Sequence, residues 1–151
     1  MQDISTDELE KLLNKTDPNK LDTYLKDNRK YFKDEKKGFT YYVKELLADK
    51  NRKLKDVYLA AGVSESFGSK ILSMEKHTKD RDLILRLCIA GHFNLQEINR
   101  ALKLYGMTEL YAKDPRDACI IVAINHRMYE LSDIDELLEQ HGMVKISSDK
   151  E

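Results

Sequence analysis

Apolar residues recur at the three- and four-residue spacing of amphipathic helices along most of the chain, and no segment shows the alternation of a half-buried strand. In FTYYVKELLADK, one helical face carries Phe39, Val43, Leu46 and Leu47. In DLILRLCIAGHF, the residues expected to face a core are Leu83, Leu87 and either Ala90 or Ile89. The pattern predicts an all-α protein.

Residues that favour helix ends divide this pattern into separate helices. Helix starts are indicated at Ser5 with Glu8, Asp17 with Pro18, Ser64, and Asn94 with Glu97. Gly62 and Gly106 lie where two apolar patterns stop, and glycine readily adopts the left-handed conformation that ends many helices. The charged run KDEKKG, residues 33–38, is either a linker or a solvated helix end.

The second half of the chain contains an internal repeat. Arg81-Asp82 opens an apolar helix, a turn and a second helix that ends at Gly106-Met107, and a similar series runs from Arg116-Asp117 to Gly142-Met143. The offset is 35 residues at the Arg-Asp pairs and 36 at the Gly-Met pairs, so the second copy has one extra residue near its turn. Two such hairpins can stack and share a core, as tandem helical pairs do.

These features predict four segments. They are an N-terminal helical lead (1–37), a helix-turn-helix domain (38–106), a C-terminal helical hairpin (107–143) whose first helix starts at Asp114-Pro115, and a flexible tail (144–151) that is expected to fray.

The composition agrees with a compact helical protein: 41% of the 151 residues are hydrophobic and 35% are charged. Cys88 and Cys119 lie in apolar runs without CxxC spacing, which indicates reduced, buried thiols and a cytoplasmic protein. No apolar stretch approaches the ~20 residues of a membrane helix, and the acidic start is unlike a secretion signal, so we expect no membrane partner.

Positive charge is concentrated in one part of the chain. The formal net charge is −1, but residues 50–81 contain eight basic and four acidic residues. Residues 82–151 contain eight basic and twelve acidic residues. Any nucleic-acid contact is therefore expected from the local patch and not from the protein as a whole.

The basic segment includes AAGVSESFGSKIL, residues 60–72, which is typical of the turn and second helix of a helix-turn-helix. In such a motif the first helix contacts phosphates and the second presents its N-terminal side chains to base edges. Phosphate contacts are expected from Lys50, Arg52, Lys53 and Lys55 before and within the first helix, and from Lys76, His77 and Lys79 behind the second. The whole predicted DNA-contacting set is Arg52, Lys53, Lys55, Ser64, Glu65, Ser66, Ser69, Lys70, Lys76 and Lys79.

Base reading falls to Glu65, Ser66, Ser69 and Lys70, a set without the Arg, Asn or Gln that make the strong bidentate pairings. Phe67 and Ile71, four residues apart, are expected in the core. Gly68 weakens the second helix by roughly 0.5–1 kcal/mol relative to alanine, so it is expected to allow close approach of DNA backbone or of a neighbouring helix.

Residues typical of catalysis or metal binding do not group along the chain. The four histidines are scattered, and there is no HxxxH, cysteine pair, glycine-rich phosphate loop or nucleophile elbow. We therefore expect a non-enzymatic protein without a metal or other cofactor.

The segment YVKELLADKNRKLKDVYLAAGVSESFGSKIL resembles the helix-turn-helix of lambda-repressor-like, XRE-type bacterial regulators, most clearly at AGVS, Phe67 and Ile71. The longer segment DRDLILRLCIAGHFNLQEINRALKLYGMTELYAKDPRDACIIVAINH resembles a group of small bacterial XRE-like proteins. They share an Arg-Asp opening, a Gly-ended hairpin, a Leu-Tyr step and a second Arg-Asp-Ala helix. Together with a short acidic helical lead, the resemblance covers roughly residues 20–143.

The resemblance implies a lambda-repressor-like helix-turn-helix bundle with N-terminal helices and a second C-terminal helical hairpin. It also implies a DNA-binding transcriptional regulator or an accessory protein, and some members are encoded near serine/threonine kinases. This chain differs from common XRE proteins in having Glu65 where Gln or Arg is usual early in the second helix.

Two functions follow from these observations. The first is an XRE-type transcriptional regulator that binds double-stranded DNA as a homodimer, with the acidic C-terminal hairpin as its dimer or effector surface. The alternative is a protein-interaction adaptor on the same scaffold, associated with or phosphorylated by a serine/threonine kinase. The alternative rests on the hydroxyl groups beside Glu65, namely those of Ser64, Ser66, Ser69 and Thr78.

Overall fold

The computed structural model describes residues 5–27 and 38–147, and all of its regular elements in those ranges are helices. The all-α prediction is therefore confirmed. The chain divides into two compact units, Met1–Asp34 and Glu35–Glu151. The described helices of the first unit are α1 (Thr6–Asn14), the short 3-10 helix η1 (Pro18–Lys20) and α2 (Leu21–Asp27). Those of the second are α3 (Gly38–Asp49), α4 (Leu54–Ala61), α5 (Glu65–Leu72), α6 (Arg81–Ala90), α7 (Leu95–Leu104), α8 (Pro115–Asn125) and α9 (Leu131–Gln140).

Helix α1 begins at the predicted cap. The Ser5 hydroxyl accepts a hydrogen bond from the Glu8 amide at 3.2 Å, which satisfies one free donor at the start of α1. Pro18 starts η1, although the preceding Asp17 makes no side-chain capping bond. The predicted linker KDEKKG lies outside the described residues except for Gly38, which begins α3.

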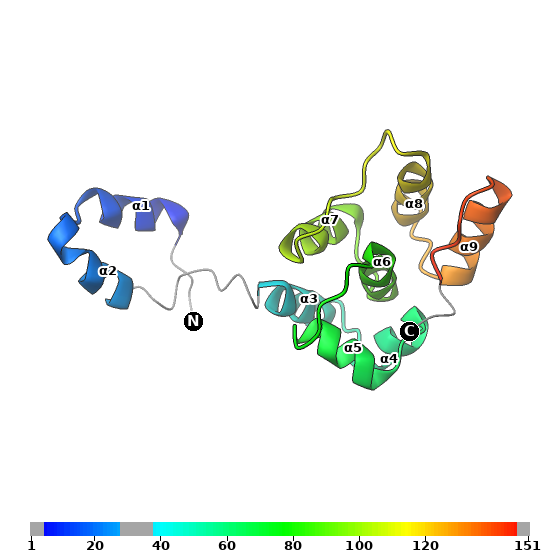
Figure 1. The fold of residues 1–151 in the computed structure, drawn as a ribbon, viewed down its shortest axis with the longest axis horizontal. Coiled ribbons are helices and arrows are strands. Elements are labelled where there is room, and N and C mark those ends of the chain that lie inside the picture. The colour runs from blue at the N-terminus through cyan, green and yellow to red at the C-terminus, as the bar shows by residue number, and fades with distance from the viewer. Residues whose placement is uncertain (1–4, 28–37, 148–151) are drawn as a thin grey trace. The chain divides into compact units, whose positions relative to one another are not determined.

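Helix α6 lies in the middle of the second unit, and α4, α7 and α9 pack against it (Figure 1). Its residues from Leu83 to Ala90 are all buried, so the inward positions predicted at Leu83, Leu87, Ile89 and Ala90 are confirmed. Because neighbours cover α6 on all sides, the helix also buries Arg86, which the sequence pattern did not predict. The Arg86 guanidinium donates to the carbonyls of Ala61 at 3.2 Å and Ile146 at 3.1 Å.

The predicted boundaries around α4, α5 and α7 are confirmed. Gly62 ends α4 at φ +74°, and the Ser64 hydroxyl accepts from the Phe67 amide at 3.1 Å at the start of α5. Asn94 and Glu97 form a complete capping box at the start of α7. These ends depend on short-range hydrogen bonds, which explains why the sequence indicates them directly.

The two hairpins α6–α7 and α8–α9 show the same helix ends. His92 and Arg127, 35 residues apart, both adopt left-handed backbone conformations after α6 and α8. Gly106 and Gly142, 36 residues apart, do the same after α7 and α9. The extra residue of the second copy therefore lies between Arg127 and α9, at Tyr129. The Tyr129 ring stacks on that of His92, with ring centroids 4.2 Å apart.

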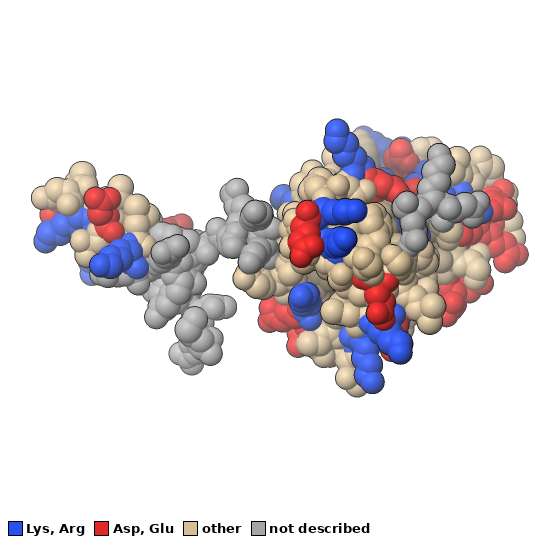
Figure 2. Space-filling model, turned by 60° about the horizontal axis from the view of Figure 1, so that its bottom comes forward, with Lys and Arg blue, Asp and Glu red and all other residues tan. Residues whose placement is uncertain are grey.

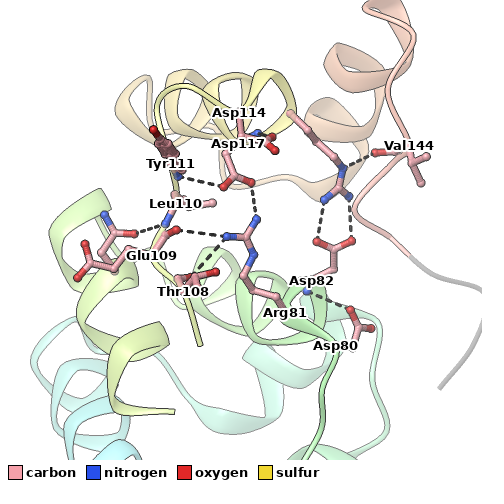
Figure 3. Close-up of polar contacts among 12 residues, drawn as sticks. Asp80, Arg81, Asp82, Thr108, Glu109, Leu110, Tyr111, Asp114, Asp117 and Val144 are labelled. Carbon is pink, nitrogen blue, oxygen red and sulfur yellow. Dashed lines mark hydrogen bonds and ion pairs between the residues drawn. The ribbon is translucent and has the colours of Figure 1, made fainter. Parts of the chain in front are cut away.

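The Arg-Asp pairs that open the two hairpins exchange partners (Figure 3). Arg81 at the start of α6 bonds Asp117 at the start of α8, while Arg116 binds Asp82 in return through two hydrogen bonds of 2.8 and 2.9 Å. Asp117 is buried and also accepts from the Tyr111 amide at 3.0 Å. The sequence repeat therefore corresponds to a reciprocal set of ion pairs that ties α6 to α8.

Residues 144–147 differ from the prediction of a frayed tail. Ile146 is only 1% exposed, and its amide donates to the Asp135 carboxylate at 2.7 Å while its carbonyl accepts from Arg86. Arg116 also donates to the carbonyl of Val144 at 3.0 Å. These residues are docked because charged side chains of the packed helices satisfy their backbone groups and because an isoleucine enters the core.

The two cysteines differ in environment. Cys88 is buried in α6, and burial raises the pKa of its thiol well above the usual range, whereas Cys119 in α8 is only partly buried. Both thiols are free. Within residues 5–27 and 38–147, no helix has the length and apolar character needed to cross a membrane.

Candidate nucleic-acid interface

Helices α4 and α5, joined by a three-residue turn, form the candidate site. Four predicted contact residues, Lys55, Glu65, Ser66 and Ser69, line one groove together with Leu54 and Tyr58. The groove has a volume of about 500 Å³. The residues meet because Lys55 and Tyr58 lie on successive turns of α4, while Glu65, Ser66 and Ser69 share the outer face of α5.

Gly68 sets the distance between the two helices. It is buried, and a β-carbon at this position would lie 2.5 Å from Cδ1 of the Tyr58 ring. Of the two roles predicted for Gly68, the structure shows close approach to a neighbouring helix. Tyr58 thereby forms part of the groove, and burial together with the nearby charge of Glu65 raises the pKa of its phenol.

Helix α5 is held firmly on the core. Phe67 is half-buried, while Ile71 and Leu72 are buried, as expected for the inner face. At the N-terminus the Ser64 hydroxyl is occupied as the cap, and at the C-terminus the Thr40 hydroxyl of α3 donates to the Leu72 carbonyl at 2.5 Å. The exposed serines and Glu65 therefore lie on a helix whose inner face is buried and whose C-terminus is bonded to α3.

The basic residues of the predicted patch divide into two groups. Lys53, Lys55 and Lys79 are exposed, and Lys53 is the residue before α4. Arg52 instead donates to the Ala90 carbonyl at 2.9 Å, and Lys50 pairs with Glu97 at 2.9 Å. These contacts stabilise the C-terminus of α6 and the start of α7. Phosphate contact by either side chain stays a prediction.

Lys70 lies in the last turn of α5 and is half-buried, and it does not line the groove. The loop after α5 carries Lys76 and His77. Lys76 places its ammonium 6.0 Å from the centre of the Phe67 ring, and its amide donates to the Lys70 carbonyl at 3.1 Å. His77 stacks on Tyr105 with ring centroids 4.5 Å apart, and the Tyr105 hydroxyl accepts from the Thr78 amide at 2.9 Å. Tyr105 thus fixes the loop, a role that the sequence did not indicate.

The face on which α4 and α5 lie is mixed in charge. Figure 2 turns this side of the second unit toward the reader and shows Lys and Arg side chains in separate groups with Asp and Glu between them. The lysines therefore do not merge into one continuous basic surface on the face drawn. Any phosphate contacts would therefore be made by separate lysines. The acidic Glu65 lies beside Lys55 at the groove.

A second hollow, of about 600 Å³, lies beside the exchanged ion pairs and is lined by Arg81, Asp117 and the α7–α8 connection (Figure 3). Two of its charged side chains, Arg81 and Asp117, are already bonded to groups of the protein. Arg81 donates to the carbonyls of Thr108 and Glu109 as well as to Asp117. This hollow is explained by the packing of the two hairpins. Across the described part of the chain, no cluster of His, Cys, Asp and Glu side chains is arranged to hold a metal ion.

Sequence reasoning missed Tyr58, Tyr105 and Arg86 because each acts through a distant segment. Only Tyr58 has an indirect signal, since a glycine inside the short helix α5 indicates that something large packs against it. A comparison of the chain with models of protein families, with curated proteins and with solved structures finds no match.

Proposed function

We propose that α4 and α5 act as a helix-turn-helix that binds double-stranded DNA, and that the protein is a non-enzymatic transcriptional regulator of the XRE type that binds as a homodimer. The observation that carries the proposal is the groove in which Lys55 faces the exposed N-terminal half of α5. Glu65 and Ser66 at the start of α5, and Ser69 one turn later, are exposed at this groove. Exposed polar side chains near the start of α5 support the proposal, because a helix-turn-helix contacts base edges with that part of its second helix.

The basic residues between 50 and 81 predict how such binding depends on salt. Of the eight basic residues between 50 and 81, Lys50, Arg52 and Arg81 are engaged with other groups of the protein. The five remaining lysines could each neutralise a phosphate, which predicts a log–log salt slope of at most about −4.5 per protomer. Because Glu65 and two serines read bases weakly, phosphate contacts are expected to supply most of the affinity.

The direct test is a fluorescence anisotropy titration of labelled duplex DNA with the full chain at several salt concentrations. Replacing Lys55→Glu and Lys70→Glu together is expected to weaken binding at least about tenfold and to make the salt slope shallower by about two. The matched control is Lys103→Glu with Lys113→Glu, the same total change of charge at two exposed lysines of α7 and the α7–α8 connection. That connection lies on the opposite side of the unit from α4 and α5 in Figure 1. Equal affinity of both variants for DNA would refute the assignment of this face.

A selection from a random duplex pool tests sequence reading separately. If α5 reads bases, the pool converges on one site, and Ser66→Ala or Glu65→Gln changes the preferred base at a single position. If the pool stays random while binding remains salt-dependent, the protein binds only the phosphate backbone. That result would exclude sequence-specific regulation.

The alternative, a protein-interaction adaptor on this scaffold, is supported by a different observation. Leu59 is 80% exposed on the outer face of α4, and acids interrupt the basic groups on the same side of the unit (Figure 2). A serine/threonine kinase remains a proposed partner, with Ser66, Ser69 and Thr78 as candidate phosphate acceptors. Capture from host lysate with and without nuclease separates the two functions, because a partner retained after nuclease treatment and lost in Leu59→Glu supports the adaptor.

A further inference from the structure

The last described residues, 144–147, run back beside α9 and are here called the strap (Figure 1). Charged side chains of the packed helices hold its backbone. Arg86 of α6 donates to the Ile146 carbonyl at 3.1 Å. Asp135 of α9 accepts from the amides of Ile146 and Ser147 at 2.7 and 3.1 Å. The strap is therefore attached to two helices of the second unit through its main chain.

The strap has few attachments beyond these bonds. Its Ile146 side chain is buried, whereas Val144 is 76% exposed and Lys145 is exposed. Arg116 of α8 donates to the carbonyls of Val144 and Lys145 at 3.0 and 3.1 Å. Segments with few buried apolar contacts open locally at a lower free energy than the core does. We therefore expect the strap to undock while the helices stay folded.

Arg86 connects the strap to the turn between α4 and α5. The residue is only 3% exposed, and its guanidinium donates through Nε to the Ala61 carbonyl at 3.2 Å and through Nη1 to the Ile146 carbonyl. Ala61 is the last residue of α4, so its carbonyl is one of those that find no partner inside the helix. One planar, charged group therefore spans the end of α4 and the strap.

Undocking of the strap changes the surroundings of this cation. While the strap is docked, Arg86 is shut off from water and carbonyl oxygens on two sides satisfy its donors. A buried charge that loses a hydrogen-bond partner is strongly destabilised unless water replaces that partner. Departure of Ile146 opens one side of the guanidinium to solvent, so Arg86 is expected to turn toward water and leave the Ala61 carbonyl. The turn that precedes α5 then loses one of its bonds to α6.

We propose that the strap is a releasable clamp on the α4–α5 turn, with Arg86 as the positioning residue between them. The docked strap holds the turn, and the undocked strap loosens it. Such coupling is reciprocal, so a change that loosens the turn loosens the strap as well. The inference goes beyond DNA binding and does not depend on it. The further consequence that the docked strap favours DNA binding rests on the function proposed above.

The test is amide hydrogen exchange of the full chain, followed residue by residue with NMR spectroscopy. The variant Ile146→Asp places a charge at the buried position and is expected to undock the strap. Val144→Asp is the matched control, because it adds the same charge to the strap at a side chain that is 76% exposed. Ile146→Ala is measured in parallel, so that the comparison does not depend on one variant that fails to fold.

Two amides in equivalent positions report the result. The Val63 amide donates to the Tyr58 carbonyl at 3.0 Å after α4, and the Phe93 amide donates to the Cys88 carbonyl at 3.1 Å after α6. Each follows a residue with a left-handed backbone. In Ile146→Asp we expect exchange at least about fivefold faster at Val63, with Phe93 within about twofold of the wild type. The control variant should leave both amides unchanged.

Three outcomes would overturn the proposal. If the Ser147 amide exchanges faster in Ile146→Asp but Val63 does not, the strap leaves without any effect on the turn. If Val63 and Phe93 accelerate equally, the strap belongs to one cooperative core and does not act on the turn. If the Ser147 amide is unaffected, the strap is not releasable.

A second variant tests the positioning role of Arg86. Arg86→Lys keeps the positive charge but replaces the planar fork with a single ammonium, which cannot bond the two carbonyls in the same geometry. We expect faster exchange at both Val63 and Ser147 and little change at Phe93. A change at Val63 alone or at Ser147 alone would contradict the proposal that Arg86 joins the two segments.

The consequence for DNA binding is measured separately, by anisotropy titration of labelled duplex DNA at one salt concentration. Ile146→Asp is expected to bind at least about fivefold more weakly than Val144→Asp, which carries the same added charge. Equal affinity of the two variants would refute regulation of DNA binding by the strap. A wild-type chain that binds no DNA would refute the proposed function instead, and the exchange measurements would still decide whether the strap holds the turn.

Discussion

Replacing Gly68 with alanine tests whether the contact between α4 and α5 is as close as described. A β-carbon at this position would lie 2.5 Å from Cδ1 and 2.7 Å from Cε1 of Tyr58. The Tyr58 side chain has little room to withdraw, because the residue is only 5% exposed. Gly68→Ala therefore forces the helices apart or the ring out of its place.

Two opposing effects decide the magnitude. Adding a methyl group to a well-packed contact costs about 1–3 kcal/mol, whereas alanine in place of glycine inside a helix gains roughly 0.5–1 kcal/mol. The expected net result is a loss of about 0.5–2 kcal/mol in the free energy of unfolding. Because the displaced helix carries Glu65, Ser66 and Ser69, we also expect weaker DNA binding from this variant.

The assay is urea unfolding followed by circular dichroism at 222 nm (far-ultraviolet), read as a change in midpoint at constant slope. Ser69→Ala is the matched control, since it lies at an exposed position of α5 outside the contact and loses only a local hydrogen bond to the Ser66 carbonyl. A stabilised Gly68→Ala protein would refute the reasoning, because it would mean that only helix propensity acts at this position. Tyr58→Leu combined with Gly68→Ala should recover part of the loss if the ring is the obstacle.

Three further predictions address the second unit. Asp117→Ala should cost about 2–4 kcal/mol of unfolding free energy by leaving Arg81 without its carboxylate. Asp82→Ala removes the carboxylate of the more exposed pair and should cost less unfolding free energy. Equal losses for the two variants would show that burial of Asp117 does not strengthen its ion pair. Ile146→Ala should cost about 2–4 kcal/mol, and a loss near zero in urea unfolding would show that residues 144–147 do not dock. Burial and the charge of Arg52 lower the pKa of His92. The unfolded chain therefore binds more protons at this histidine than the folded chain, and the free energy of unfolding should fall as pH drops below about 6.5. His92→Asn, which tolerates the left-handed backbone at this position, should flatten that dependence, and an unchanged pH profile would exclude His92 as its source.

The helix ends and the repeat could be predicted from the sequence because they are local or periodic. Ser64, Asn94 and Gly62 act within four residues of their own position, and the Arg-Asp pairs recur at a fixed offset. The docked Ile146 could not be predicted in this way, since its partners Arg86 and Asp135 lie 60 and 11 residues away.

The same distinction holds for the candidate site. The sequence identifies Lys55, Glu65, Ser66 and Ser69 as neighbours because helical spacing and one short turn bring them together. It does not show that Arg52 is held by the Ala90 carbonyl, because nothing local distinguishes a lysine or arginine that faces solvent from one that caps a distant helix. DNA binding itself stays a prediction for the experiments above to decide.

The exchange of partners between Arg81-Asp82 and Arg116-Asp117 has a consequence for how the second unit comes apart. If the two hairpins separate, each keeps one arginine and one aspartate without their ion-pair partners. Neither hairpin is therefore expected to be stable alone. Replacing α8–α9 with an unrelated segment, or ending the chain before Pro115, would leave both Arg81 and Asp82 of α6 without their partners. The two hairpins should therefore unfold in a single cooperative transition. Variants that lack the second hairpin should not fold stably.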